Sequence, residues 1–172
     1  WQHHTSNSRG VGILLRAGLV PDGQATIEYT DTQTQEPGRL LRVGWDLQGG
    51  QHLSVLAVYA PSEPAGRPAF FSGAFADAVL QPQLQASHLI VAGDFNCVLD
   101  QRDVQPAPGQ PAAASSRMQG AQDMQLVCQG AALKDAWRAL HPAQRDFTHH
   151  LAGQHRSEEH TSELQSLALS RM

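Results

Sequence analysis

A carboxylate and an amide stand two residues apart in the GDFN motif at residues 93–96, directly after the apolar run LIVA. Alternate residues of a strand face the same side, so Asp94 and Asn96 are expected to point together while Phe95 points into the core. Gly93 removes a side chain where a ligand or another backbone comes close. The pair suits phosphodiester hydrolysis, in which Asp94 orients or deprotonates a water and Asn96 donates a hydrogen bond to a phosphate oxygen. A turn in which Asp94 accepts a backbone hydrogen bond explains the same residues equally well.

A phenol and a short helix offer further groups. Tyr59 ends the apolar run at residues 52–59 and is followed by Ala-Pro, which stops a strand because proline has no amide donor. Its hydroxyl can donate a hydrogen bond to a phosphate, although such a tyrosine more often simply lies at a sheet edge. Asp135 and Arg138 are three apart on one helical face, with Trp137 between them. We interpret these three residues as structural support: an ion pair and a core tryptophan.

The elements that position these groups follow from hydrophobic periodicity. Strands are expected at residues 10–15, 25–30, 39–47, 52–59 and 88–98 and from residue 147, and helices at 68–84, from Ser115 or Ser116 to about 133, and at 135–140. The three strands between residues 25 and 59 suit an antiparallel meander, and the strand at 88–98 is apolar enough to be central. This order of strands and helices predicts an α/β sandwich.

Composition limits the class of protein. The chain has 172 residues, 41% of them hydrophobic, which is typical of one globular domain or most of one. The net charge of -4 counts mildly against a large nucleic-acid footprint, although a small basic rim around a site can suffice. Cys97 and Cys128 form neither a zinc pattern nor a disulfide framework, and we expect both to be small core residues. No apolar run approaches the length that spans a bilayer, so no membrane partner is expected.

Five motifs in order resemble the endonuclease/exonuclease/phosphatase superfamily, which has the fold of pancreatic deoxyribonuclease. They are SRGVGIL at residues 8–14, VYAP at 58–61, GDFN at 93–96, DAWR..HP at 135–142 and FT at 147–148. The likeness is greatest to the endonuclease domain of non-LTR (LINE-type) retrotransposons and covers about residues 5 to 150, with GDFN the most specific part. It implies a four-layer sandwich of two mixed β-sheets flanked by helices, and a requirement for Mg²⁺ or Mn²⁺.

The resemblance also implies roles for individual residues. Tyr59, Asp94 and Asn96 would be catalytic, Asn96 and Thr148 would bind phosphate, and Asp94 would be a metal ligand. DNA would be the substrate of a monomeric, Mg-dependent endonuclease, whose parent polyprotein would also carry a reverse transcriptase domain and act in the nucleus. A phosphatase or phosphodiesterase of the same superfamily, or a non-catalytic remnant, are the alternatives.

Departures from the family pattern set a limit on activity. The family's asparagine and metal-binding glutamate precede SRGVGIL, whereas this chain starts at Trp1, and His149 stands where an aromatic residue is usual. The segment RSEEHTSELQS at residues 156–166 looks like a translated sequencing adapter and stands where the family has its final aspartate and histidine. We therefore expect residues 1–155 to be a partial, marginally stable domain that lacks full catalytic competence. Residues 156–172 are expected to be a non-native tail, disordered or a stray helix.

Overall fold

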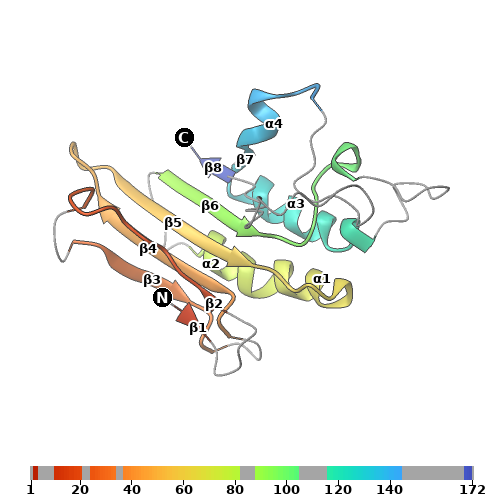
Figure 1. Ribbon diagram of the computed structural model, residues 1–172, viewed down its shortest axis with the longest axis horizontal. Coiled ribbons are helices and arrows are strands. Elements are labelled where there is room, and N and C mark those ends of the chain that lie inside the picture. Colours follow the sequence, from red (N-terminus) through yellow and green to blue (C-terminus); the bar gives the residue numbers. More distant parts are fainter. Residues whose placement is uncertain are drawn as a thin grey trace, which may run out of the picture.

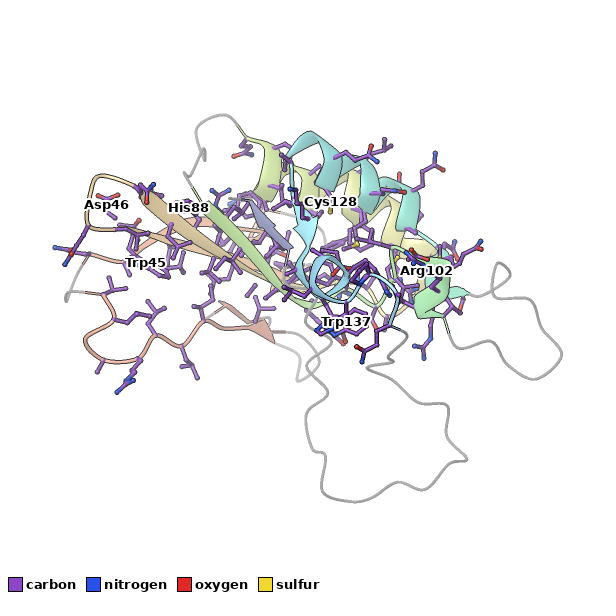
Figure 2. The ribbon with its side chains drawn as sticks, turned by 90° about the horizontal axis from the view of Figure 1, so that it is seen from above. Trp45, Asp46, His88, Arg102, Cys128 and Trp137 are labelled. Atoms are coloured by element: carbon purple, nitrogen blue, oxygen red, sulfur yellow. The ribbon has the colours of Figure 1, made fainter. Side chains whose placement is uncertain are left out.

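The computed structural model describes residues 2–3, 10–20, 24–33, 37–81, 88–104, 116–144 and 169–171. These residues form an α/β arrangement, in which a mixed sheet carries helices on one face (Figure 1). A small ribbon of two strands lies over the opposite face, as the view from above shows (Figure 2). In the described ranges, no helix is both long and apolar enough to cross a membrane.

The sheet begins with the expected meander. Strands β3 (Thr26–Thr30), β4 (Leu40–Asp46) and β5 (His52–Tyr59) pair antiparallel in sequence order. Strand β6 (His88–Asp94) then pairs parallel with β5, so its predicted position inside the sheet is confirmed. Because two parallel neighbours need a connection that crosses over the sheet, the chain between them must cover one face.

That connection is helical. It consists of the turn η1 (Pro64–Gly66), helix α1 (Arg67–Phe70), the wide turn η2 (Phe71–Phe75) and helix α2 (Ala76–Leu80). The predicted helix extended to residue 84, but the observed one ends at Leu80, and Gln81 is extended with ψ 127°. Proline follows Gln81 in the sequence, and a residue that precedes proline avoids the helical region.

The chain after β6 forms the turns η4 (Gln101–Asp103) and η6 (Ser116–Met118) and the helices α3 (Ala121–Gly130) and α4 (Ala136–Leu140). Of these helices, α3 packs against α1 and α2, whereas α4 lies beside β7. Helix α3 does not start beside a serine cap as predicted, because Gly120, with φ 90°, stands before its first turn. A Cβ at Gly120 would press against Arg67 and Phe71 of the connecting helix, so the glycine lets the two helical segments approach closely.

An aromatic cluster fills the space between helices and sheet. Phe71 and Phe75 are fully buried, and their rings meet edge to face with centroids 5.5 Å apart. Phe95 is 1% exposed and packs edge to face on Phe75, so its predicted inward direction is confirmed. Leu56 of β5 and Val91 of β6 bring the sheet into the same core.

The first expected strand is much shorter than predicted. Only Gly10–Val11 is a strand, β2, and it pairs with the two-residue strand β1 (Gln2–His3). Residues 12–16 keep an alternation of exposure, and Leu14 is 90% exposed. An apolar pattern becomes a strand only where a neighbouring edge supplies hydrogen-bond partners, and within the described residues that neighbour is just two residues long.

Three residues of the C-terminal tail lie within the sheet. Leu169–Arg171 form strand β8, which pairs antiparallel with β6 and with β7 (Lys134–Asp135). For these residues the expectation of disorder or a stray helix is wrong. An open strand edge presents a row of amide and carbonyl groups, and an extended segment of almost any sequence can satisfy it. The adapter-like origin of the tail stays a prediction.

We expect Phe75→Ala to lower the free energy of unfolding by about 3–5 kcal/mol, since it leaves a cavity inside the aromatic cluster. Urea denaturation followed by circular dichroism measures the change. Leu126→Ala is the matched control, because Leu126 lies on α3 with 60% of its surface exposed. Its effect should stay within about 0.5 kcal/mol. Equal losses in the two variants would contradict the described core.

Candidate functional site

Parallel pairing brings two of the predicted site residues to one edge of the sheet. Tyr59 is the last residue of β5, Asp94 is the last residue of β6, and the two are direct partners in the register. Paired residues of neighbouring strands project from the same face of a sheet. The Ala60 amide donates to the Asp94 carbonyl at 2.8 Å and continues the pairing one step beyond the strands. The phenol and the carboxylate therefore start from adjacent, fixed backbone positions.

Gly93 is required at this edge by the backbone itself. Its φ of 145° is a conformation that side chains disfavour. A Cβ at this position would also overlap the carbonyl group of Val58 on the neighbouring strand. The predicted close approach of another backbone is therefore confirmed.

The relation between Asp94 and Asn96 differs from the expected one. Strand β6 ends at Asp94, and Asn96 has a left-handed φ of 48°, so strand alternation does not reach it. Instead the backbone amide of Asn96 donates to Asp94 Oδ1 at 2.9 Å. This is the turn that the sequence left open as the alternative. Asn96 Nδ2 donates to the Ala60 carbonyl at 2.9 Å. The two side chains are neighbours because of a turn, not because they share a strand face.

The turn leaves part of each side chain available. None of the described residues donates to Asp94 Oδ2, and Asn96 retains its side-chain oxygen and one amide hydrogen. Both residues are half-buried. The arrangement presents a fixed hydrogen-bond acceptor, an amide and, one strand away, the phenol of Tyr59.

Two arginines outside the sequence motifs support this edge. The Arg39 guanidinium lies 5.6 Å from the centre of the Tyr59 ring and donates from Nη1 to the Tyr59 carbonyl at 3.3 Å. The backbone of Arg39 is itself fixed, because its amide donates to the buried Asp31 carboxylate at 2.9 Å. The antiparallel register of β4 and β5 pairs Leu40 with Val58 and so places Arg39 beside Tyr59. The expected meander is the feature of the sequence from which this proximity could have been predicted.

Arg67 anchors the loops below the site. Its guanidinium donates to three carbonyl groups, those of Pro61, Ser62 and Ser116, at 2.9, 2.7 and 2.9 Å. Burial lowers the pKa of Arg67 from its ordinary value, while the charges of Cys97 and Asp94 act in the opposite direction. Arg67 thus links the residues that follow β5 to Ser116, the first residue of η6.

The helix predicted to give structural support has different contacts from those expected. Asp135 caps α4 by accepting a hydrogen bond from the Arg138 amide at 2.9 Å, and the guanidinium of Arg138 pairs with Asp103 instead. Burial raises the pKa of Asp103, although the charge of Arg138 opposes it. Trp137 is half-buried, and so is not a core residue. Its ring centre lies 4.8 Å from the guanidinium carbon of Arg138 and 5.1 Å from the ring centre of His141. The predicted ion pair between Asp135 and Arg138 is therefore wrong, because the guanidinium of Arg138 pairs with Asp103.

The described residues do not by themselves form a magnesium site. Thr148 lies outside the described residues, and Asp94 is the carboxylate at this edge. Across the described part of the chain, His, Cys, Asp and Glu side chains nowhere gather in a group of three that could hold a metal ion. Cys97 and Cys128 are buried, and burial raises their pKa values to about 11 and about 12, so both are core thiols as predicted.

Comparison with known proteins adds no family to this description. The chain matches no protein-family model, and a search of curated proteins also found no match. The chemistry of the edge that Tyr59, Asp94 and Asn96 form is therefore the basis for a functional assignment.

Gly93→Ala is expected to lower the free energy of unfolding by more than about 2 kcal/mol, through overlap with a main-chain carbonyl and an unfavourable φ. Thermal or urea unfolding measures it. Gly73→Ala is the control, because Gly73 is helical and a Cβ there meets nothing within 4 Å. This control should raise stability by up to about 1 kcal/mol. A neutral Gly93→Ala would refute the described register of β5 and β6.

Proposed function

We propose that the edge formed by Tyr59, Asp94 and Asn96 belongs to a phosphodiester hydrolase, a DNA endonuclease of retrotransposon type. The observation that carries the proposal is the register partnership of Tyr59 with Asp94, with Asn96 on the turn that follows. A general base, an amide donor and a phenol donor at one edge are the groups that attack on a phosphate ester needs.

The hydrogen bonds suggest how the work is divided. Asp94 Oδ1 is held by the Asn96 amide, so Oδ2 is the oxygen that would orient a water and accept its proton. The Asn96 side chain is held through the Ala60 carbonyl, and its second amide hydrogen would donate to a phosphate oxygen. Tyr59, steadied by the guanidinium of Arg39, would donate its hydroxyl to the same phosphate. Held donors lose little freedom when they meet a developing charge, which is why such fixation favours catalysis.

The metal requirement and the full architecture belong to the same proposal. Mg²⁺ or Mn²⁺ is implied by the resemblance, and no step is assigned to it because the described donor set does not form a metal site. We also propose that the sheet is one half of a four-layer sandwich. The helices on one face and the β1–β2 ribbon on the other support this interpretation (Figure 2).

Binding tests the proposal directly. In a nuclear magnetic resonance titration with Mg²⁺ present, thymidylyl-thymidine should shift the amide signals of Tyr59, Asp94 and Asn96. Thymidine, which lacks the phosphate, should leave them unchanged. Asp94→Ala removes the turn acceptor and should weaken the response. Equal shifts with both ligands, or shifts confined to other parts of the sheet, would reject this edge as the phosphate site.

Nicking of supercoiled plasmid by this chain should not exceed that of its Asp94→Ala variant in the presence of Mg²⁺. The reason is that one carboxylate is a poor site for an ion that prefers six oxygen ligands. Gel electrophoresis measures the nicked fraction. Nicking clearly above the variant would show that the chain holds a complete catalytic set. Phosphate release from a small monoester, without nicking, would favour the phosphatase alternative.

A further inference from the structure

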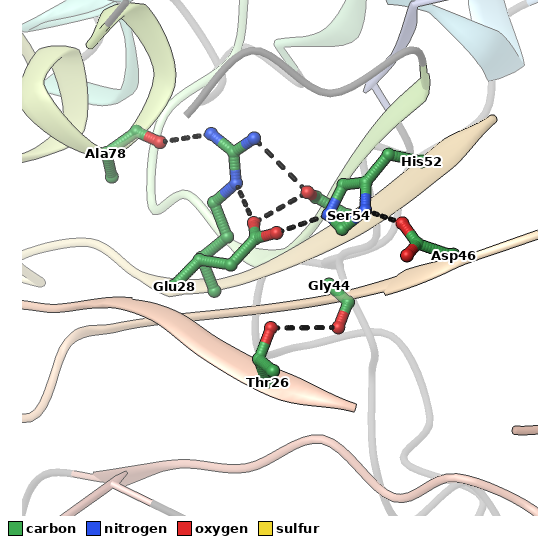
Figure 3. A network of polar contacts seen from close by, with 8 residues as sticks. Thr26, Glu28, Gly44, Asp46, His52, Ser54 and Ala78 are labelled. Carbon is green, nitrogen blue, oxygen red and sulfur yellow. Dashed lines mark hydrogen bonds and ion pairs between the residues drawn. The ribbon is translucent and has the colours of Figure 1, made fainter. Parts of the chain in front are cut away.

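A separate set of polar contacts crosses three strands at the other end of β5 (Figure 3). Glu28 of β3 accepts a hydrogen bond from Ser54 Oγ of β5, with 2.6 Å between Oγ and Oε2. Its other oxygen, Oε1, lies 2.5 Å from His52 Nε2. The second ring nitrogen of His52, Nδ1, lies 2.6 Å from Asp46 Oδ1 on β4. The imidazole therefore stands between two carboxylates.

The crossing depends on a residue without a side chain. Gly44 lies on β4 between Thr26 of β3 and Ser54 of β5 in the register. A Cβ at Gly44 would overlap both Glu28 Oε1 and His52 Nε2. Because Gly44 leaves this space empty, a side chain from β3 reaches over β4 and contacts β5 directly. Main-chain pairing joins only adjacent strands, so this contact is an additional bond across the sheet.

The proton on His52 decides whether the contact attracts. A neutral imidazole donates from one nitrogen only, whereas an imidazolium donates from both. With a carboxylate oxygen within 2.6 Å of each nitrogen, the neutral ring would turn a lone pair toward one of the two carboxylates. The hydrogen bonds with Asp46 and then Glu28 raise the pKa of His52, with burial acting against them. Burial raises the pKa of Glu28, but Ser54, His52 and Arg42 together lower it, so its carboxylate stays ionised.

The other charge at this place is fixed. Arg42 of β4 is 1% exposed, donates from Nε to Glu28 Oε2 at 2.8 Å and from Nη1 to the Ala78 carbonyl of α2 at 2.9 Å. Its Nη2 donates to Ser54 Oγ at 3.2 Å. With His52 protonated, two cations face the two carboxylates of Glu28 and Asp46. With His52 neutral, Arg42 is the cation that these described contacts leave for the two carboxylates.

We propose that the Glu28–His52–Asp46 bridge is a proton-dependent latch that fastens strand β3 to β5 and lets β3 loosen when His52 loses its proton. In the described sheet β3 is the outermost strand on its side, and its pairing with β4 is interrupted by an irregularity in register between Ile27 and Tyr29. Because β3 pairs on one side only in the described sheet, and its hydrogen-bond ladder with β4 is irregular, it depends strongly on the additional side-chain contact with β5.

The direction of the pH effect follows from the raised pKa of His52. A group whose pKa is raised on folding contributes its full stabilisation below its unfolded pKa, about 6.5 for histidine. That stabilisation is lost as the pH rises through the folded pKa. The latch is therefore strongest in mildly acidic solution and weaker above the folded pKa, where the hydrogen bond from Ser54 to Glu28 still joins β3 to β5. The Asp46 side chain is 82% exposed, so solvent screens its attraction to the imidazolium. The Glu28 side chain is 14% exposed, so its contact with His52 contributes most of the pH-dependent stabilisation.

A titration of the whole chain by nuclear magnetic resonance tests the latch. The ring signals of His52 should titrate above the ordinary value for histidine. Across the same pH range, protection of the β3 amides from hydrogen exchange, corrected for intrinsic rates, should fall by about tenfold for each unit of the pKa shift. Protection of the β6 amides should change less. A His52 that titrates at or below the ordinary value, or β3 protection that ignores its titration, would overturn the proposal.

Two histidine variants separate the latch from general acid sensitivity. His52→Gln cannot acquire a charge, so β3 protection should lose its pH dependence across that range. His88→Gln is the matched control, because His88 begins β6 and is likewise half-buried, and this variant should keep the wild-type dependence. Loss of the dependence in both variants, or its persistence in His52→Gln, would reject His52 as the switch. If His52→Gln does not fold, the wild-type titration and exchange data decide the question.

Discussion

The parallel pairing of β5 with β6 is the interaction on which the rest of the molecule depends. It runs from the partnership of Leu53 with His88 to that of Tyr59 with Asp94. Parallel neighbours require a crossover, and this requirement places the helical segment of residues 67–80 on one face, where its phenylalanines make the core. The same pairing brings two side chains with useful chemistry to one edge. Fold and candidate site therefore share a single cause.

Much of this fold could be predicted from the sequence, because it follows from local patterns. Alternation and turn residues located the meander, and continuous apolarity located β6, since burial of apolar surface is what both patterns report. Helix ends were less accurate, because Gln81 and Gly120 act through backbone conformation rather than through hydrophobic pattern. Strand β8 could not be foreseen, since its pairing depends on the open edge of β6 and not on its own residues.

The candidate site was predictable in membership and less so in geometry. Tyr59 and Asp94 follow from where their strands end, and two strand ends meet whenever the register is parallel. The turn at Asn96 and the contact of Arg39 with the tyrosine ring depend on which polar partner is nearest once the chain has folded. The sequence offers several partners for each arginine and ranks none of them. Arg138, which pairs with Asp103 on a distant turn, shows the same limitation.

Strand β5 joins two regions of different chemistry, with the His52 contacts at its start and Tyr59 at its end, roughly 23 Å apart along an eight-residue strand. Gly44 is the less obvious member of the first region. It has no charge and no polar side chain, yet every larger residue would separate a carboxylate from an imidazole. Substitution of Gly44 is therefore limited by the charged contact between Glu28 and His52 that a side chain would disrupt, and not by the backbone conformation of the glycine. In an alignment of related chains such a glycine would covary with ionisable residues on the flanking strands.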